Sequence, residues 1–296
     1  MDRHELLTRI TTFPLIARGL AEDLLSGDYR AIFRGQGIEF DEVRRYEQGD
    51  DIRSIDWNVS ARFGTPYVKL YREEREMTVC IILDNSHSMF TTGGNLSRSP
   101  GSDLNRYEQA LLAAALIAFS AEQAGQRLSM IFFDREISKI IPPRKGRSHT
   151  MAVISAALEA LPQEKGSGLG KALIGAERLL KRRSLVIIIS DFLCINWEQE
   201  IGDLARRHDV ISLRISGPLD KEMPISGLLA LEDPETGLKI RAPSSFPSFR
   251  NAWVSWHEER SQLWEAICRR SGAAYLELST ADDAPTALKH FFRGRL

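Results

Sequence analysis

The pattern of apolar residues after residue 76 limits this chain to a small set of folds. Short runs rich in Val, Ile and Leu alternate there with longer stretches of helical periodicity. The predicted strands are Thr78–Leu83, Leu128–Phe133, Leu185–Ile189, Val210–Ile215 and Ala274–Leu278. The predicted helices are Arg106–Ala124, His149–Leu161, Leu169–Lys181, Trp197–Arg207, Val254–Ser271 and Ala284–Phe292. Such alternation predicts an α/β domain with a doubly wound, mostly parallel sheet covered by helices on both faces.

Two segments lie outside this alternation and predict a small β-rich elaboration. At residues 228–242, two strand-like runs flank the turn sequence DPETG, which predicts a β-hairpin. Residues 1–76 begin with an expected amphipathic helix pair, interrupted near Pro14, and continue with turn signals and short β segments such as Tyr67–Arg72. We therefore predict an N-terminal helical and β-rich segment at 1–76 and an α/β domain at 77–296 that carries the hairpin as an insertion.

The charge balance restricts the kinds of partner. The chain carries 39 Lys and Arg against 40 Asp and Glu, a net charge of −1, whereas a general nucleic-acid surface needs a basic surplus. The three cysteines are far apart and no pair has metal-site spacing, which favours reduced thiols. The apolar runs are too short to span a membrane, and the first residues lack the features of a secretion signal. We expect a cytoplasmic protein, which can include a position at the periphery of a membrane complex.

A polar turn at the end of the first predicted strand carries the strongest functional signal. The apolar run that starts at Met77 ends in DNSHS at 84–88, so Asp84, Ser86 and Ser88 occupy alternate positions. Open α/β sheets bind ligands at the carboxyl ends of their strands. One carboxylate and two neutral hydroxyls are hard oxygen donors, which suit Mg²⁺ or Mn²⁺ better than zinc.

Two other loops add candidate donors. A second apolar strand ends at Ser190-Asp191, so Asp191 is expected at the same edge of the sheet as Asp84. The sequence KGSGLG at 165–170 opens a helix and offers the Ser167 hydroxyl. In the alternative interpretation, Asp84 and the two serines after it only cap the following helix. The combination of three loops favours the metal site, as a hypothesis.

These residues also carry a resemblance to known proteins. The pattern Asp84-x-Ser86-x-Ser88 resembles the metal-ion-dependent adhesion site of von Willebrand factor A-type domains. The upstream sequence GDDIRSIDWNVSAR at 49–62 resembles the signature of domain-of-unknown-function family 58, whose members carry an A-type domain and are often linked to MoxR-type AAA+ ATPases. The resemblance implies a von Willebrand factor A-like fold and direct ligation of a divalent ion by Ser86 and Ser88. It also implies that Asp84 and Asp191 act directly or through water.

The function implied by the resemblance is protein binding rather than catalysis. In A-type adhesion sites an Asp or Glu of a partner replaces a water molecule on the metal, which implies an acidic client protein beside the MoxR-like ATPase.

One position departs from the family pattern. A-type domains usually carry threonine followed by aspartate in the third loop, and this chain has Ser167 and Gly168 there. Ser167 keeps the hydroxyl, whereas the nearby carboxylate is lost.

The family signature holds a second cluster of candidate residues: Asp50, Asp51, Arg53, Asp56 and Trp57. We interpret the charged residues as an ion-pair network that pins the N-terminal segment to the sheet, with Trp57 as a packing anchor. Binding of a ligand or a partner by the same residues is the alternative.

The segment from Thr91 to Asn105 follows the metal turn directly and is rich in Gly, Ser and Asn. We predict a mobile loop that controls partner access to the metal.

The competing functional class is a Mg²⁺-dependent phosphotransferase or phosphatase with Asp84 as the nucleophile. It is less favoured because haloacid-dehalogenase-like enzymes typically carry a second aspartate two residues after the first, and this chain has Ser86 there.

Overall fold

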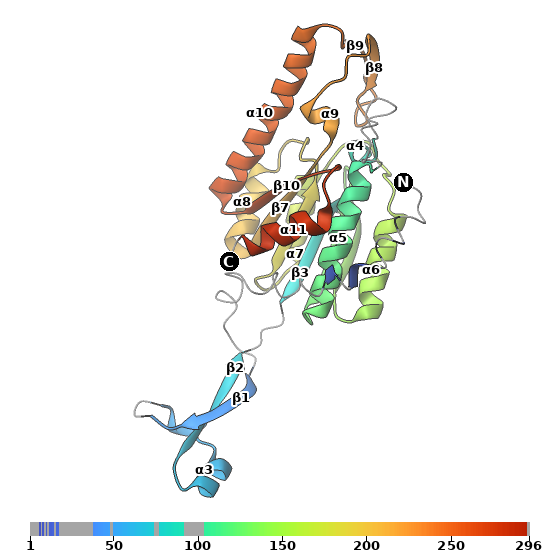
Figure 1. Cartoon of the computed structure of the whole chain (residues 1–296). Helices are drawn as coiled ribbons and strands as arrows, with labels where there is room; N and C mark the ends of the chain where they lie inside the picture. The colour runs from blue at the N-terminus through green and yellow to red at the C-terminus, as the bar shows by residue number, and fades with distance from the viewer. Residues whose placement is uncertain are drawn as a thin grey trace. The chain divides into compact units, whose positions relative to one another are not determined.

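The computed structural model describes residues 6, 8, 10, 12–14, 16–17, 38–47, 50–73, 77–91 and 104–294 (Figure 1). The chain divides into two compact units, one of residues 28–76 and one of residues 77–296 together with 1–27. One boundary therefore falls after residue 76, and the first 27 residues group with the α/β unit rather than with the segment that follows them.

Within the described residues, six strands form the central sheet of the larger unit. They are β3 (Thr78–Asp84), β4 (Arg127–Phe133), β5 (Ile137–Arg144), β6 (Leu185–Ser190), β7 (Asp209–Ser216) and β10 (Ala274–Ser279). The sheet order is β10-β7-β6-β3-β4-β5, and every neighbouring pair is parallel except β4 and β5. This is the order of a doubly wound sheet whose winding reverses between β3 and β6. The predicted α/β fold class is confirmed.

The edge strand β5 was missed by the sequence prediction. Its sequence, ISKIIPPR, contains two prolines, and its side chains are half-buried or exposed. It pairs antiparallel with β4 alone. Prolines are tolerated there because an edge strand leaves half of its backbone groups unpaired in any case. A proline-containing run without clear alternation gave no strand signal.

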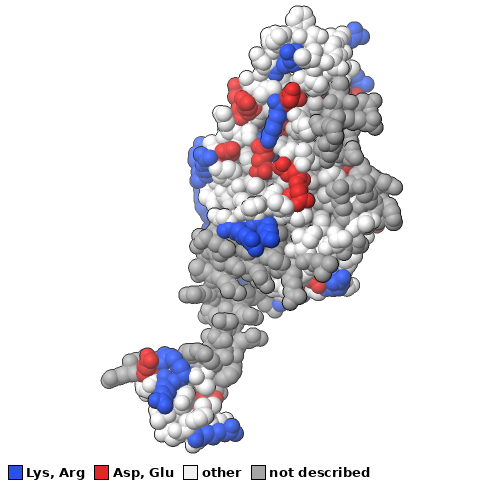
Figure 2. Space-filling model, in the orientation of Figure 1, with Lys and Arg blue, Asp and Glu red and all other residues white. Residues whose placement is uncertain are grey.

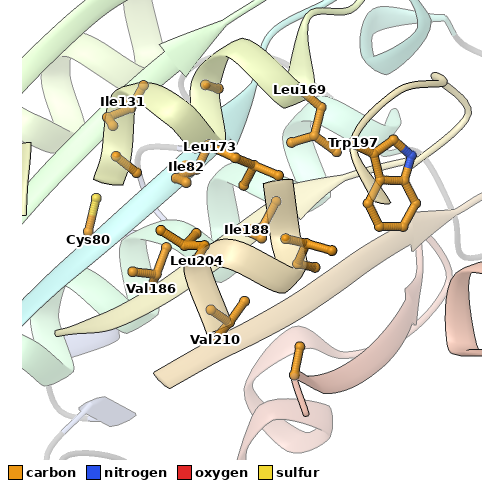
Figure 3. Close-up of a cluster of buried hydrophobic side chains, with 14 of the residues drawn as sticks. Cys80, Ile82, Ile131, Leu169, Leu173, Val186, Ile188, Trp197, Leu204 and Val210 are labelled. Carbon is orange, nitrogen blue, oxygen red and sulfur yellow. The ribbon is translucent and has the colours of Figure 1, made fainter. Parts of the chain in front are cut away.

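Helices cover both faces of the sheet. One face carries α5 (Arg106–Gln123), α6 (Arg147–Glu159) and α11 (Ala284–Arg293), and the other carries α7 (Leu169–Leu179), α8 (Glu198–Arg207) and α10 (Pro247–Ser271). Figure 3 shows the core on the second face, where Cys80 and Ile82 of β3 lie in one cluster with Leu173 and Leu204. Side chains alternate along a strand, so Ile81 is buried on the opposite face.

The helix α5 is buried along most of its length and has further protein on its outer side. The described residues between 6 and 17 are helical, Pro14 included. They bury four apolar side chains at helical spacing, Leu6, Ile10, Phe13 and Ala17. Ser120 Oγ donates a hydrogen bond to the carbonyl of Ala17 at 3.4 Å, and Gln123 Nε2 donates to that of Pro14. These N-terminal residues therefore pack on α5. The second helix of the predicted pair lies outside the described residues.

The smaller unit consists of β1 (Ile38–Arg45), the 3₁₀ helix η1 (Ile52–Ser54), α3 (Trp57–Phe63) and β2 (Tyr67–Glu73). The two strands pair antiparallel, with a register shift between Phe40 and Glu42. Two strands and one short helix are too little to enclose a hydrophobic core. Large apolar side chains of this unit are consequently exposed, Ile52, Trp57 and Phe63 among them.

The predicted hairpin is confirmed as β8 (Leu228–Glu232) and β9 (Lys239–Pro243), which pair antiparallel. In Figure 1 it lies at the same end of the larger unit as α4 (His87–Phe90), close to the carboxyl ends of the parallel strands. A short helix, α9 (Pro218–Lys221), follows β7.

Charged side chains of both signs are interspersed on the face shown in Figure 2, as the balanced composition predicts. None of the described helices has both the length and the apolar character needed to cross a membrane.

Candidate metal site

The candidate site lies where β3 and β6 run side by side, which is the point at which the winding of the sheet reverses. Leu83 of β3 pairs in parallel register with Ile189 of β6, so Asp84 and Ser190 emerge next to each other. Ser190 Oγ donates a hydrogen bond to Asp84 Oδ2 at 2.6 Å. Doubly wound sheets bind their ligands in the crevice at this reversal. The fold therefore puts Asp84 at the position where a ligand is expected.

The first loop turns its three polar side chains toward one another. Asp84 Oδ1 accepts a hydrogen bond from the backbone N–H of Ser86 at 2.9 Å, and the hydroxyl oxygens of Ser86 and Ser88 are 3.1 Å apart. All three side chains are buried. Ser86 occupies the N-cap position of α4, yet within the described structure its side chain makes no capping hydrogen bond. The capping interpretation of Ser86 is therefore wrong, and its hydroxyl is directed to Ser88 instead.

The second and third loops contribute buried oxygen atoms that the described structure leaves without a hydrogen-bond partner. These are Asp191 Oδ2, which lies 3.6 Å from Arg106 Nη1, and Ser167 Oγ, which lies next to the Cys194 thiol. Asp191 Oδ1, by contrast, accepts from the backbone N–H of Leu193 at 3.0 Å. Buried polar atoms are nearly always satisfied, so each exception calls for a ligand, ion or water. An oxygen-binding cation would satisfy both, and the residues present fit such an ion.

The electrostatics of the site also favour a cation. Burial raises the pKa of Asp84 to about 7, and the nearby charge of Asp191 adds to this effect, against the hydrogen bonds from Ser190 and Ser86. The thiol of Cys194 lies close enough to sense both carboxylates. Its pKa is raised to about 12, by burial first and then by the charges of Asp84 and Asp191. Two buried carboxylates that disfavour each other's ionised form are stabilised by a divalent cation between them.

An aspartate that the sequence interpretation missed holds the third loop in place. Asp134 follows β4 and is buried; its Oδ2 accepts hydrogen bonds from the backbone N–H groups of Gln163 at 2.9 Å and Glu164 at 3.2 Å. Its carbonyl accepts from Gly168 N–H at 2.6 Å. Asp134 thereby anchors both ends of the segment that carries Ser167. The signal was available, because Asp134 follows an apolar strand in the same way as Asp84.

The departure from the family pattern at residue 168 has a steric cause. A Cβ atom added to Gly168 would lie 2.1 Å from the carbonyl oxygen of Arg135, inside any allowed contact distance. The backbone of the third loop passes so close to the end of β4 that only glycine fits. An aspartate is therefore excluded at this position by the path of the chain.

Restoring the family aspartate with Gly168→Asp should consequently fail. We expect a loss of stability of about 1–3 kcal/mol from overpacking, and no gain in metal affinity. Urea unfolding with and without Mg²⁺ measures both. Gly202→Ala in α8, where an added Cβ meets nothing within 4 Å, is the control and should be neutral or mildly stabilising. Tighter metal binding by an intact Gly168→Asp protein would show that the loop can be rebuilt.

The signature residues lie in the smaller unit and serve local structure there. Asp50 forms a bidentate ion pair with Arg44, at 2.7 and 2.9 Å, and this pair lowers the pKa of Asp50. Asp56 caps α3 by accepting from the backbone N–H groups of its first turn. Asp51 accepts from Ser54 through its carbonyl. The side chain of Arg53 lies outside the description.

Trp57 is 69% exposed in the described structure. Two strands and one short helix offer no interior for an indole ring within the smaller unit. The interpretation of Trp57 as an anchor between this segment and the sheet stays a prediction. The predicted mobile loop is not tested, because residues 92–103 lie outside the described residues.

A buried arginine next to the site was also missed. Arg106, the first residue of α5, contacts Asp220 of α9 at 2.5 Å and Asp191 at 3.6 Å. All three side chains are largely buried. Asp220 Oδ2 additionally accepts from the backbone N–H of Gly217 at 2.9 Å. Arg106 thus compensates part of the negative charge at this edge and ties it to α9.

A doubly wound sheet with an Asp-x-Ser-x-Ser loop at its point of reversal defines a von Willebrand factor A-like domain. The family model described as "Protein of unknown function DUF58" matches residues 42–262, and the chain belongs to this family. The uncharacterized protein Rv1480 of Mycobacterium tuberculosis is 31% identical over 300 residues, covering all of this chain and 91% of its own length.

Solved structures with a related fold include the conserved hypothetical protein BatB from Bacteroides thetaiotaomicron, with 17% identity and a TM-score of 0.46 over 74% of this chain and 98% of that one. An aerotolerance-related membrane protein from Bacteroides fragilis has 18% identity and a TM-score of 0.48 over 73% of this chain and 96% of that one. The SpRpn10 VWA domain has 11% identity and a TM-score of 0.41, over 72% and 94%.

Proposed function

We propose that this chain is a protein-binding adaptor whose binding depends on a divalent cation, Mg²⁺ or Mn²⁺. The ligands would be Asp84, Ser86, Ser88, Ser167 and Asp191. The observation that carries the proposal is a pair of buried oxygens without a hydrogen-bond partner in the described structure, Ser167 Oγ and Asp191 Oδ2, at the same sheet edge as the facing hydroxyls of the first loop. Arg106 Nη1 lies 3.6 Å from Asp191 Oδ2, which is an ion-pair contact and not a hydrogen bond. A bound ion would supply a Lewis-acidic position for a carboxylate oxygen from outside.

The charges of the chain's own residues suit this role. Asp84 and Asp191 supply two negative charges, and the three serines supply neutral oxygens. Arg106 already compensates part of the charge of Asp191. A divalent ion in such a site keeps a net positive charge, and an acidic side chain of a client protein is the group that complements it.

We further propose a MoxR-type AAA+ ATPase as the second partner, with this chain delivering an acidic client for assembly or activation of a complex. The support is the link of family members to such ATPases. Co-purification of the tagged chain from its native cell, with Mg²⁺ or with EDTA, tests it. Recovery of a client that is indifferent to EDTA would contradict the metal requirement, and absence of any AAA+ protein would contradict the ATPase partner.

The metal requirement has a direct test that leaves the charge of the site unchanged. Ser86→Ala with Ser88→Ala should abolish the stabilisation by Mg²⁺ or Mn²⁺, which for a saturating ion amounts to about 2.7 kcal/mol at one hundred times the dissociation constant. Thermal unfolding with metal and with EDTA is the measurement. Ser129→Ala removes another buried hydroxyl, in β4, and should respond to the metal as the unmodified protein does. An equal metal response in the double variant would refute the ligand assignment.

The phosphotransferase alternative has weaker support. Both carboxylate oxygens of Asp84 already accept hydrogen bonds, from Ser86 N–H and Ser190 Oγ, and the side chain is fully buried. The position two residues after Asp84, which carries the second aspartate in haloacid-dehalogenase-like enzymes, is Ser86 in this chain. Absence of Mg²⁺-dependent hydrolysis of an aryl phosphate is the expected result.

A further inference from the structure

The tip of the β8–β9 hairpin is built to project one side chain, Glu235. Asp233 Oδ1 accepts a hydrogen bond from the backbone N–H of Glu235 at 3.0 Å, and the Asp233 carbonyl accepts from Gly237 N–H at 2.7 Å. Gly237 adopts a positive φ of 75°, which closes the turn. This local network fixes the backbone conformation at Glu235 and does not use the Glu235 side chain.

Glu235 reaches the candidate metal site and joins two of its loops. Its Oε1 accepts a hydrogen bond from the backbone N–H of Ser88 at 2.8 Å, and its Oε2 accepts from the backbone N–H of Gly166 at 2.6 Å. Ser88 belongs to the first loop, and Gly166 directly precedes Ser167 in the third. Lys165 Nζ also approaches the turn, because it lies 2.9 Å from where a Cβ of Gly237 would be. A carboxylate of this chain therefore sits across the ligand loops.

The remainder of the hairpin is loosely packed in the described structure. β8 and β9 contact mainly each other, and Leu228, Leu238 and Ile240 are 62%, 64% and 45% exposed. The two hydrogen bonds of Glu235 are consequently a main attachment of the hairpin tip to the sheet domain. Hydrogen bonds to a charged acceptor are stronger than hydrogen bonds between neutral groups, so these two bonds hold the hairpin tip in place. They are noncovalent, so the hairpin tip can still detach.

We propose that Glu235 is an internal ligand that occupies the position of an acidic side chain from a partner protein. The inference rests on the proposed function, and it names how that function is regulated. Glu235 holds the hairpin tip on Ser88 and Gly166, beside the proposed metal ligands, so the hairpin must lift before an outside carboxylate reaches the ion. The hairpin is tethered at millimolar effective concentration, so a partner needs additional contacts to displace it.

Hydrogen exchange in EDTA tests the internal contact without metal or partner. Glu235→Ala should accelerate exchange of the Ser88 and Gly166 amides by about tenfold or more, and Glu235→Gln should have a smaller effect. Glu232→Gln is the matched control, because Glu232 lies on the same hairpin and pairs with the exposed Lys239 at 3.3 Å. Unchanged exchange at both amides in Glu235→Ala would overturn the inference.

A synthetic peptide of residues 228–243 tests the competition. The Glu235→Ala protein should bind this peptide about tenfold or more tightly than the unmodified protein, whose site is already occupied. A peptide with Gln at position 235 should bind more weakly. Equal binding by both proteins, or binding by neither, would overturn the inference.

The outcomes separate the two proposals. The exchange measurement is made in EDTA, so it does not depend on the metal. The peptide measurement is made with Mg²⁺, because the proposed function gives an outside carboxylate a position on the ion. If Mg²⁺ or Mn²⁺ does not stabilise the unmodified protein, the proposed function is overturned. An intact metal response with unchanged amide exchange in Glu235→Ala overturns the hairpin inference alone.

Discussion

Replacing Arg106 with methionine is expected to lower the free energy of unfolding by about 3–5 kcal/mol, because it removes from two buried carboxylates the arginine that contacts them. Arg106 contacts Asp220 at 2.5 Å and Asp191 at 3.6 Å, with side-chain exposures of 14%, 8% and 4%. Methionine fills much of the same space, so the loss is mainly electrostatic. Denaturant unfolding in EDTA gives the number.

Arg183→Met is the matched control for this prediction. Arg183 pairs with Asp209 at 2.7 Å but is half exposed, and exposed pairs contribute at most about 1 kcal/mol. Combining Arg106→Met with Asp220→Asn should recover part of the lost stability, since one buried charge is removed. Similar losses in Arg106→Met and Arg183→Met would contradict the account of a buried network.

The same variant should respond more strongly to metal. Without Arg106, Asp191 has lost a cation that offsets its charge, so Mg²⁺ or Mn²⁺ should raise the melting temperature of Arg106→Met by more than that of the unmodified protein. An unchanged or smaller metal response would show that Arg106 and the metal ligands are independent.

Replacing Asp84 with asparagine should have opposite effects with and without metal. In EDTA at pH 8 the variant should be more stable than the unmodified protein, by up to a few kcal/mol, because a buried charge beside Asp191 is gone. Stabilisation by Mg²⁺ should disappear. Asparagine keeps the size of the side chain and can still accept the Ser86 N–H. Melting curves at matched pH, with metal and with EDTA, measure both effects.

The pH dependence of this variant follows from the sign of the pKa shift. The folded-state pKa of Asp84 is raised from 3.8 to about 7, so the folded protein holds a proton that the unfolded chain has released. Stability of the metal-free protein therefore falls as the pH rises from about 4 to about 7. The advantage of Asp84→Asn should grow over this range and level off above it. An advantage that is already complete at pH 4 would refute the buried-charge explanation.

The fold and the first two site loops were predictable because they follow from strong local patterns. Buried parallel strands read as continuous apolar runs, and a polar residue that ends such a run marks the carboxyl edge of the sheet. Asp84 and Asp191 were identified in this way. Asp134 follows the same rule and could have been found.

The remaining features depend on contacts between distant parts of the chain, which a single sequence does not encode locally. Arg106 meets Asp220 across 114 residues, and Glu235 meets Ser88 across 147. The glycine at 168 looked like a lost ligand and proved to be a steric requirement set by Arg135.

The packing of the N-terminal residues on α5 determines which truncated fragments keep that helix covered. A fragment that starts at residue 77 looks natural from the family signature, yet it would strip Leu6, Ile10, Phe13 and Ala17 from the outer side of α5. The uncovered alanine- and leucine-rich surface would invite self-association. Expression of the α/β unit alone should therefore retain residues 1–27, joined to residue 77 by a linker in place of the smaller unit.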